Sequence, residues 1–371
     1  MRKLLLISFL LLACGGADET APQAQVDSTG VIEPSFSIGE EMGDSTVVFG
    51  ALETVIYDSR GNIAALDMGM ANVRIFSPEG EYLRTIGRRG NGPGEFQRPL
   101  GMVLLGTGSI GVMDPWGEGF TEITSNYEQA GVLMEIHSNV HLGMCGVDST
   151  DIIGIRAGER TSDEPSVPFV IGRYSLSTEP SVIYWRKEFP ALTMEDLAEA
   201  MREYAAIAFT ADPASGDVYV CPYVENRYEI TRCSDAGEVL NTIAMEIPAV
   251  DKTEEEVAVE AEYLRARITA LNGSDMGIDI TPYPERRSVS SMGVDGHGCL
   301  WVRRGTEEEA LLDRWTPEGE LLGTYRVPDS NLYWRFSFCR QGILAFNENP
   351  DEYQQIFVME YPPMNRSVTL N

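Results

Sequence analysis

The chain has few of the residues that usually build catalytic centres. Only three histidines occur among its 371 residues: His137, His141 and His297. His137 and His141 are four residues apart, but their surroundings predict a loop and a strand, so the spacing does not imply a shared metal face on a helix. No HExxH, GxSxG or Ser-Xaa-Xaa-Lys motif occurs. These absences disfavour zinc and serine hydrolases, and we assign no catalytic residue.

Positive charge is also scarce. Lys and Arg number 28 against 57 Asp and Glu, which gives a formal net charge of −29. A chain this acidic repels phosphate backbones, so we expect no nucleic-acid partner. A solvated acidic surface accounts for the excess of carboxylates, and cation binding is the alternative. We therefore expect no cofactor, with calcium as the one exception left open, and the sequence names no metal ligand.

No apolar run is long enough to span a bilayer as a helix, which takes about 20 residues. The longest, residues 4–12, follows Arg2 and Lys3 and precedes a cysteine, which is the order of a secretory signal. The stretch Leu11-Leu12-Ala13-Cys14 resembles the bacterial lipobox. That resemblance implies that residues 1–13 are a signal peptide, that the thiol of Cys14 is diacylated, and that its lipid attaches the protein to a membrane.

The residues after Cys14 are small and polar. Such a segment cannot bury enough apolar surface to order itself, so residues 14–31 are expected to be a lipidated, flexible linker. Gly15 follows the cysteine, where an aspartate favours retention in the inner membrane of well-studied bacteria. We therefore expect an exported protein, anchored by lipid to the cell envelope at the outer membrane.

Five further cysteines occur, without a CxxC pair or a zinc-type spacing. An exported protein is free to form disulfides. Cys221 and Cys233 fall on two predicted neighbouring strands, so a bridge between them is one hypothesis, and buried free thiols are the other.

An internal repeat organises the rest of the chain. The first half of each unit is two short apolar strands around a Gly, Asp or Ser turn, with copies at 53–67, 100–114, 144–155, 207–220, 290–302 and 335–346. The second half is another hairpin, with copies at 73–87, 120–136, 172–185, 228–243, 312–326 and 354–370. One four-stranded sheet has two apolar faces and cannot stand alone, but stacking six of them around an axis covers both faces. The repeat therefore predicts an all-β fold: a six-bladed β-propeller of four-stranded antiparallel blades over residues 32–371.

Two segments interrupt the repeat and have helical periodicity. They are residues 192–206 and 251–273. Thr253 is the predicted N-cap of the second, and three glutamates follow it at the positive end of the helix dipole. Both segments fall between blades, so we expect them on one face of the disc.

The stretch 58–99 resembles NHL-type repeats, and more closely the exported six-bladed propellers of environmental bacteria. The residues that carry the resemblance are Asp58, Gly61, Asn62, Asp67, Asn72, Arg74, Ile75, Phe76, Gly80, Pro99 and the run from Ile86 to Phe96. The arginine at position 74 is expected to recur as Arg314 in the fifth blade. A seventh blade would need a repeat within residues 30–50, where only Phe36–Ile38 and Ser45–Phe49 have strand character. One of these is expected to pair with the last blade and close the ring.

Four residues are weak candidates for ligand binding. Arg88 and Arg89 lie in the glycine-rich run 87–96, which lacks the Lys-Ser/Thr of a P-loop and is expected to be an interblade turn that leaves both arginines able to meet an anion. Asp67 and Asp114 end the second strands of their blades, where a carboxylate either caps the next turn or points into the channel toward a cation. Aromatic residues at strand ends are expected to wedge between blades: Trp185, Tyr223, Tyr228, Trp301 and Trp315.

Together these features predict a non-catalytic module at the cell envelope that holds an unidentified protein or carbohydrate ligand over one face of the propeller. A calcium-dependent hydrolase or lactonase with a site in the central channel is one alternative, and it would require several carboxylate, Asn or His side chains converging on the axis. A polysaccharide-binding protein is another, and it would require several Trp or Tyr exposed on one face.

Overall fold

A computed structural model of the chain describes residues 29–135, 142–157, 166–190, 193–223, 226–272, 277–348 and 352–363. Their strands form six antiparallel four-stranded sheets, one of which gains a fifth strand at its edge. The first three sheets consist of β3 (Leu52–Tyr57), β4 (Ile63–Asp67), β5 (Asn72–Phe76) and β6 (Tyr82–Ile86); β7 (Gly101–Leu104), β8 (Ile110–Asp114), β9 (Gly119–Ile123) and β10 (Gln129–Met134); and β11 (Leu142–Gly146), β12 (Ile152–Ala157), β13 (Ser166–Tyr174) and β14 (Val182–Pro190). The next two consist of β15 (Ala208–Ala211), β16 (Val218–Cys221), β17 (Tyr228–Cys233) and β18 (Val239–Met245); and β19 (Val289–Val294), β20 (Leu300–Arg304), β21 (Ala310–Trp315) and β22 (Leu321–Val327). The last consists of β23 (Trp334–Phe338), β24 (Ile343–Asn347), β25 (Ile356–Met359) and β2 (Phe36–Ile38).

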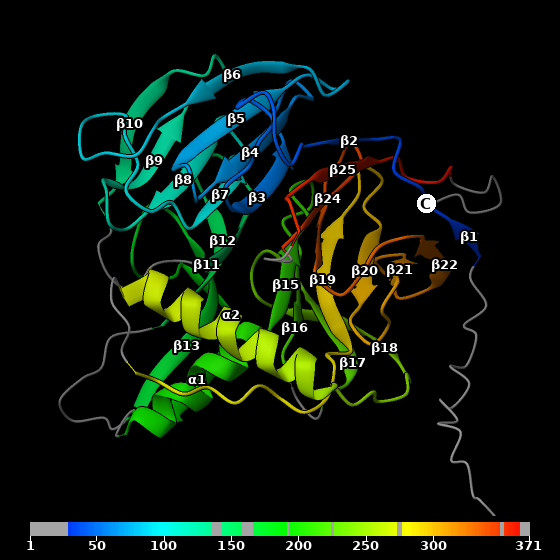
Figure 1. Cartoon of the computed structure of the whole chain (residues 1–371). Coiled ribbons are helices and arrows are strands. Elements are labelled where there is room, and N and C mark those ends of the chain that lie inside the picture. The colour runs from blue at the N-terminus through cyan, green and yellow to red at the C-terminus, as the bar shows by residue number, and fades with distance from the viewer. Residues whose placement is uncertain are drawn as a thin grey trace, which may run out of the picture.

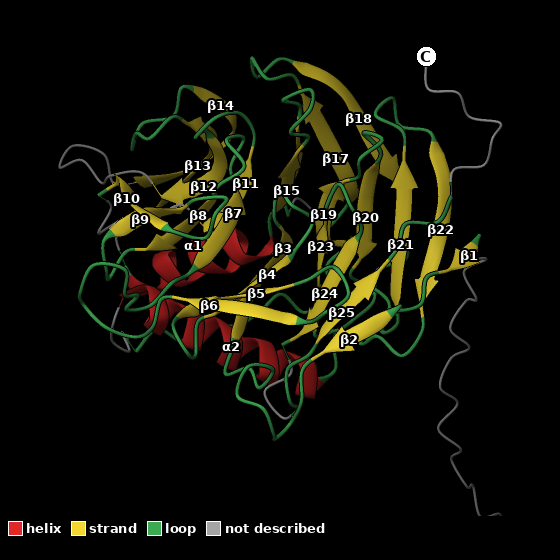
Figure 2. Cartoon of the chain, turned by 90° about the horizontal axis from the view of Figure 1, so that it is seen from above, coloured by secondary structure: helices red, strands yellow, loops and turns green. Residues whose placement is uncertain are grey.

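These sheets are arranged as blades around an axis, with the first strand of each blade innermost. The first strands contact one another in order, β3 with β7 and onward to β19 with β23, and β24 of the last blade contacts β3. Figures 1 and 2 show the blades from two directions at right angles. The fold is a six-bladed β-propeller, as the repeat predicted.

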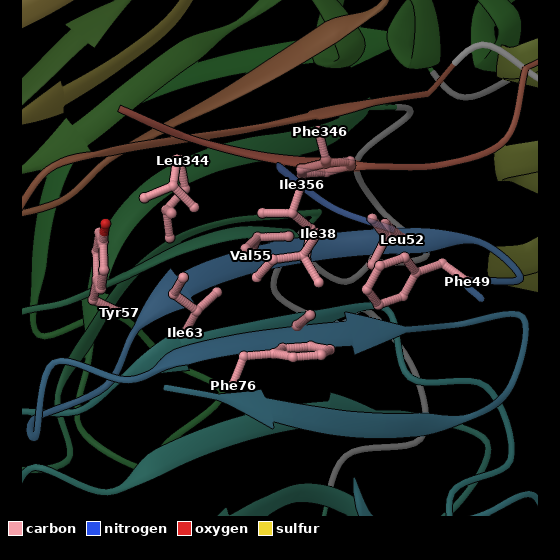
Figure 3. Close-up of a cluster of buried hydrophobic side chains, with 12 residues drawn as sticks. Ile38, Phe49, Leu52, Val55, Tyr57, Ile63, Phe76, Leu344, Phe346 and Ile356 are labelled. Carbon is pink, nitrogen blue, oxygen red and sulfur yellow. The ribbon is translucent and has the colours of Figure 1, made fainter. Parts of the chain in front are cut away.

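The core lies between the blades. The second strands of the blades are covered on both faces by the neighbouring blades, so β4, β8 and β24 are buried along their whole length. By contrast, the outer strand β6 is exposed at all but its last position. At the junction of the first and last blades, Val55 and Ile63 pack against Leu344 and Phe346 (Figure 3). Burying an apolar side chain of this size stabilises the fold by about 1.5–3 kcal/mol.

The ring is closed by a strand from the N-terminal part of the chain. Phe36–Ile38 pairs antiparallel with β25, which confirms one of the two expected closing segments. In this sheet β2 takes the place beside β25. The second strand of the hairpin predicted at 354–370 falls largely on residues 364–371, which lie outside the described part. Before β2, β1 (Gly30–Val31) pairs in parallel with β22. Residues 29–31, which the sequence assigned to the linker, thus lie in the fold; the rest of the linker and Cys14 are outside the described residues.

Two helices interrupt the blades, as predicted. They are α1 (Met194–Ala206), between β14 and β15, and α2 (Glu254–Asn272), between β18 and β19. Each N-terminus is capped by a threonine: Thr193 Oγ1 accepts from the N–H of Asp196, and Thr253 Oγ1 accepts from the N–H of Glu256. Both helices connect an outer strand to the next inner strand, so they lie on the same face of the ring and beside each other (Figures 1 and 2). Of the helices in the described residues, none has the length and apolar character to cross a membrane.

Candidate functional site

Asp67 and Asp114 are fixed in the fold by backbone donors. Asp67 accepts hydrogen bonds from the N–H groups of Gly50, Ala51 and Met70 at 2.8, 3.0 and 2.9 Å. Asp114 repeats the arrangement in the next blade with the N–H groups of Gln97, Arg98 and Gly117. Each carboxylate thus joins the end of a second strand to the segment that enters the same blade. These contacts are the turn-capping alternative that the sequence left open.

Arg88 and Arg89 lie in the link between the first and second blades. Arg89 donates to three backbone carbonyls, those of Met68, Gly69 and Gln97. Arg88 forms an ion pair with Glu95 at 2.7 Å, and its side chain is 81% exposed. The guanidinium of Arg89 is therefore engaged in holding the interblade turn, and that of Arg88 is an exposed, paired charge.

The expected recurrence of Arg74 as Arg314 is wrong by one residue. In the strand register Arg74 lies opposite Ala65, the third residue of β4, whereas Arg314 lies opposite Trp301, the second residue of β20. Since side chains alternate along a strand, a shift of one places the two arginines on opposite faces of their blades. Arg74 pairs with Asp67 and Arg314 with Asp295 in the turn before β20.

The residue equivalent to Arg74 in the fifth blade is Asp313, and it forms a charge-reversed copy of the same pair. Asp313 lies opposite the third residue of β20 and binds Arg304, which ends β20 as Asp67 ends β4. Burial lowers the pKa of Arg304, but the hydrogen bonds and charge of Asp313 outweigh this effect and leave the pKa raised. Both pairs are buried. In the first blade the acid is on the second strand and the arginine on the third, and in the fifth blade the two are exchanged.

The hypothesis of a disulfide between Cys221 and Cys233 is wrong. Both thiols are buried, and both are free, as are the thiols of the other cysteines that the structure describes. Cys233 lies opposite Val218, three residues from Cys221 along β16, and an odd number of residues places the two side chains on opposite faces. Burial raises the pKa of the Cys221 thiol to about 11.

Three of the five aromatic residues wedge between blades as predicted. Trp301 is fully buried between the fifth and sixth blades. Trp315 and Tyr228 are buried between the fourth and fifth, where Trp315 Nε1 donates to the Tyr228 hydroxyl at 2.8 Å. Tyr223 stacks on Tyr283 with the ring centres 3.9 Å apart, and Trp185 packs half-buried beside α1.

His297 lies exposed in the turn after β19, and His137 and His141 are outside the described residues. Among the described residues, no three His, Cys, Asp or Glu side chains are grouped so as to hold a metal ion.

A cavity of about 260 Å³ lies where the inner strands meet the helices. One wall is apolar and comes from α1, α2 and the third and fourth blades, with Met201, Leu264, Ile268, Ile155 and Phe209. The other wall comes from the fifth and sixth blades and is mainly polar. Beside the apolar Leu332 and Trp334 it contains Arg287, Ser290, Ser291, Arg303, Tyr333, Arg335 and Glu348. Strands β15, β19 and β23 begin at this face and β20 ends at it, so the cavity is the mouth of the propeller on the helix-covered side.

The charged residues of this wall are three arginines and one glutamate, in a protein whose overall charge is strongly negative. Arg335 Nη1 forms an ion pair with Glu348 at 2.7 Å and lies 3.9 Å from Glu53 on the innermost strand of the first blade. The one carboxylate of the wall is thus paired with Arg335.

Helix α2 is fastened across this mouth at both ends. Near its N-terminus, Arg286 binds Glu256 at 2.7 Å and donates to the carbonyl of Thr306 in the fifth blade. Toward its C-terminus, Arg98 from the second blade donates to the carbonyl of Thr269 at 3.4 Å. A helix of 19 residues is about 28 Å long, so α2 reaches across the ring and closes one side of the cavity.

The sequence did not single out any residue of this cavity as a binding residue. Two of its three arginines belong to pairs of consecutive arginines, Arg286–Arg287 and Arg303–Arg304, of which the second ends an apolar strand. Because the chain has few positive charges, two consecutive arginines at the end of a predicted strand could have been identified from the sequence as candidate binding residues. Their convergence with Arg335 depends on the ring and could not be read from spacing.

Comparison with known proteins agrees with the fold. A family model described as a six-bladed β-propeller matches residues 45–114, which contain the first blade and the first half of the second. The sequence matches none of the curated proteins.

Solved propellers resemble the chain at low identity. Regucalcin, a calcium-binding protein of Agrobacterium tumefaciens, is 10% identical, with 91% of this chain and 99% of that chain covered and a TM-score of 0.45. A gluconolactonase of Xanthomonas campestris is 11% identical, with 84% and 87% covered and a TM-score of 0.45. A catalytically inactive virginiamycin B lyase of Staphylococcus aureus is 11% identical, with 87% and 83% covered and a TM-score of 0.43. Identities this low carry no statement about activity.

Proposed function

We propose that this protein is a lipid-anchored, extracytoplasmic binding module that holds a small molecule in the cavity at the helix-covered mouth of its propeller. The observation that carries the proposal is the cavity, which approaches the lower end of the size range of small-molecule sites. Its two walls differ in polarity, and such a space orients a ligand as well as enclosing it. The anchoring part rests on the lipobox-like sequence that ends at Cys14.

The proposal is one of binding without turnover. The described lining contains serine and tyrosine hydroxyls but no histidine, and its one carboxylate, that of Glu348, forms an ion pair with Arg335. The role of the rest of the chain is then to display this mouth: the lipid fixes the protein at the envelope, and the linker separates the propeller from the membrane.

A fragment screen tests the proposal. Fluorinated fragments of up to about a dozen non-hydrogen atoms, neutral and anionic, are added to the purified protein, and line broadening in the ¹⁹F NMR spectrum reports binding. Leu332→Trp fills the cavity from its rim, and Leu240→Trp places the same side chain on the exposed outer strand β18 as a control. We expect a set of fragments that bind the natural protein and the Leu240 variant but not the Leu332 variant. If no fragment loses binding in the Leu332 variant, the proposed site is wrong.

A further inference from the structure

Arg303 is a buried cation in the polar wall of the cavity. Only 3% of the residue is exposed. Its Nη1 donates to Ser290 Oγ at 2.9 Å and its Nη2 donates to the carbonyl of Asn331 at 3.0 Å. Its guanidinium also lies over the ring of Phe336, 5.5 Å from the ring centre. These partners are neutral, and no carboxylate among the described residues forms an ion pair with it.

Two polar atoms of this wall are left without a hydrogen-bond partner. They are Arg303 Nε and Ser291 Oγ, both fully buried. Six buried side-chain atoms in the described residues lack a partner, and two of the six belong to residues that line this one cavity. Unsatisfied buried groups are rare because each costs about 1–3 kcal/mol. Two of them on one cavity wall suggest that a ligand supplies the missing acceptor.

A β-bulge brings these atoms together. In the pairing of β19 with β20, the register shifts between Val289 and Ser291, so that two residues of β19 face one of β20. The extra residue lets the consecutive serines Ser290 and Ser291 both line the cavity, although side chains normally alternate. Ser290 holds the guanidinium of Arg303, and Ser291, which lies opposite Arg303 in the ladder, keeps its hydroxyl free for a ligand.

The electrostatics of the wall favour an anion. Burial, together with the smaller effect of the nearby charge of Arg287, lowers the pKa of Arg303 to about 10. At neutral pH Arg303 nevertheless stays charged, so the wall carries a desolvated positive charge that only neutral groups of the described protein contact. An anion placed against it would regain part of the lost solvation energy, since hydrogen bonds between charged groups are about twice as strong as neutral ones.

We propose that the cavity takes the anionic group of a small amphipathic ligand, a carboxylate or a phosphate, on Arg303 Nε and Ser291 Oγ, with the apolar part of the ligand against α2 and the third and fourth blades. This inference rests on the proposed function and adds the chemical class of the ligand. It differs from the anion site expected at Arg88 and Arg89, whose guanidiniums bind Glu95 and backbone carbonyls.

A matched pair of probes tests the inference. 4-Fluorobenzoate and 4-fluorobenzamide have nearly the same shape, and only the first is charged. Each is titrated at constant ionic strength against the natural protein and the variants Arg303→Gln, Ser291→Ala and Arg88→Gln, and dissociation constants are obtained from ¹⁹F line broadening. Inorganic phosphate is then titrated as a competitor of the benzoate, which distinguishes a site for phosphate from one that prefers carboxylates.

We expect the benzoate to bind the natural protein at least tenfold more tightly than the benzamide. Arg303→Gln should weaken benzoate binding tenfold or more and leave benzamide binding within twofold. Ser291→Ala should weaken it several-fold, and Arg88→Gln should leave it unchanged. Circular dichroism and the melting temperature show whether each variant is folded.

The failures of the two proposals are distinguishable. Equal binding of acid and amide, or benzoate binding that survives Arg303→Gln, overturns the anion inference while fragments excluded by Leu332→Trp still support the cavity. The anion inference also falls if neither probe binds and if, among the fragments that lose binding in the Leu332→Trp variant, anionic fragments are no more frequent than neutral ones. If Leu332→Trp excludes nothing, the proposed function itself falls.

Discussion

Arg303 and Arg304 follow one another in β20, both are buried, and only Arg304 has an ion pair among the described residues. The guanidinium of Arg304 forms two parallel hydrogen bonds with Asp313, both 2.8 Å long. Arg303 faces the other side of the blade and meets only neutral partners. In β20 the charge of Arg304 is therefore compensated by a carboxylate, whereas the charge of the adjacent Arg303 is contacted only by neutral groups of the described residues.

This difference predicts opposite effects of the same substitution. Arg304→Met should lower the free energy of unfolding by about 3–5 kcal/mol, because it leaves the buried carboxylate of Asp313 without its cation. Arg303→Met should not lower it, since it removes an unpaired buried charge and retains an unbranched side chain of similar length. Chemical denaturation of the natural protein and both variants measures the difference. Equal losses would show that Arg303 is as structural as its neighbour, contrary to the anion inference.

The closing strand should contribute strongly to stability. Ile38 is 4% exposed and packs into the cluster between the first and last blades (Figure 3). Ile38→Ala should therefore cost about 2–5 kcal/mol, as buried Ile→Ala changes do. Val31→Ala in β1 is the control, because Val31 is 48% exposed and should change stability by about 0.5 kcal/mol or less. Similar effects of the two substitutions would mean that β2 does not close the ring in solution.

Local features of the fold could be predicted from the sequence. The hairpins follow from alternation and turn residues, and the N-cap at Thr253 from its position before three glutamates. A closing strand was expected because residues 30–50 contain too little strand for a seventh blade, although the sequence did not decide between Phe36–Ile38 and Ser45–Phe49. Features that depend on register failed. The pairing of β16 with β17 separates Cys221 from Cys233, and a shift of one residue separates Arg74 from its supposed copy Arg314.

The candidate site could not be predicted for the same reason. Ser291, Arg303 and Arg335 come from three strands in two blades, and Ser291 lines the cavity because a bulge interrupts β19. Neither the bulge nor the contact between blades has a local sequence signal. The sequence placed Asp67 and Asp114 at the ends of second strands and left open whether they cap a turn or bind a cation. Only the fold shows which N–H groups donate to them.

The attachment of α2 should be sensitive to acid. Burial alone raises the pKa of Glu256, but the hydrogen bond and charge of Arg286, with the N–H and hydroxyl of Thr253, outweigh it and leave the pKa lowered. A carboxylate with a lowered pKa stabilises the folded state above its unfolded pKa, and this contribution is lost as the pH falls through the folded value.

The difference in unfolding free energy between the natural protein and Glu256→Gln should therefore be present at pH 6 and shrink toward pH 3. Glu255→Gln, one residue earlier and exposed, is the control and should show little difference at any pH. Denaturant titrations across this pH range measure both. A difference for Glu256→Gln that stays constant with pH would contradict the role assigned to the Arg286–Glu256 contact.

Membrane attachment should depend on a single thiol. If Cys14 is the lipidation site, Cys14→Ser should move the protein from the membrane fraction to the soluble extracytoplasmic fraction and abolish incorporation of labelled palmitate. Cys339→Ser is the matched control, because Cys339 is a free thiol inside the propeller and should leave both properties unchanged. Gly15→Asp should keep the label but shift the protein toward the inner membrane. A Cys14→Ser protein that still pellets with membranes would show that another part of the chain makes the attachment, and the lipid would then have no part in displaying the cavity.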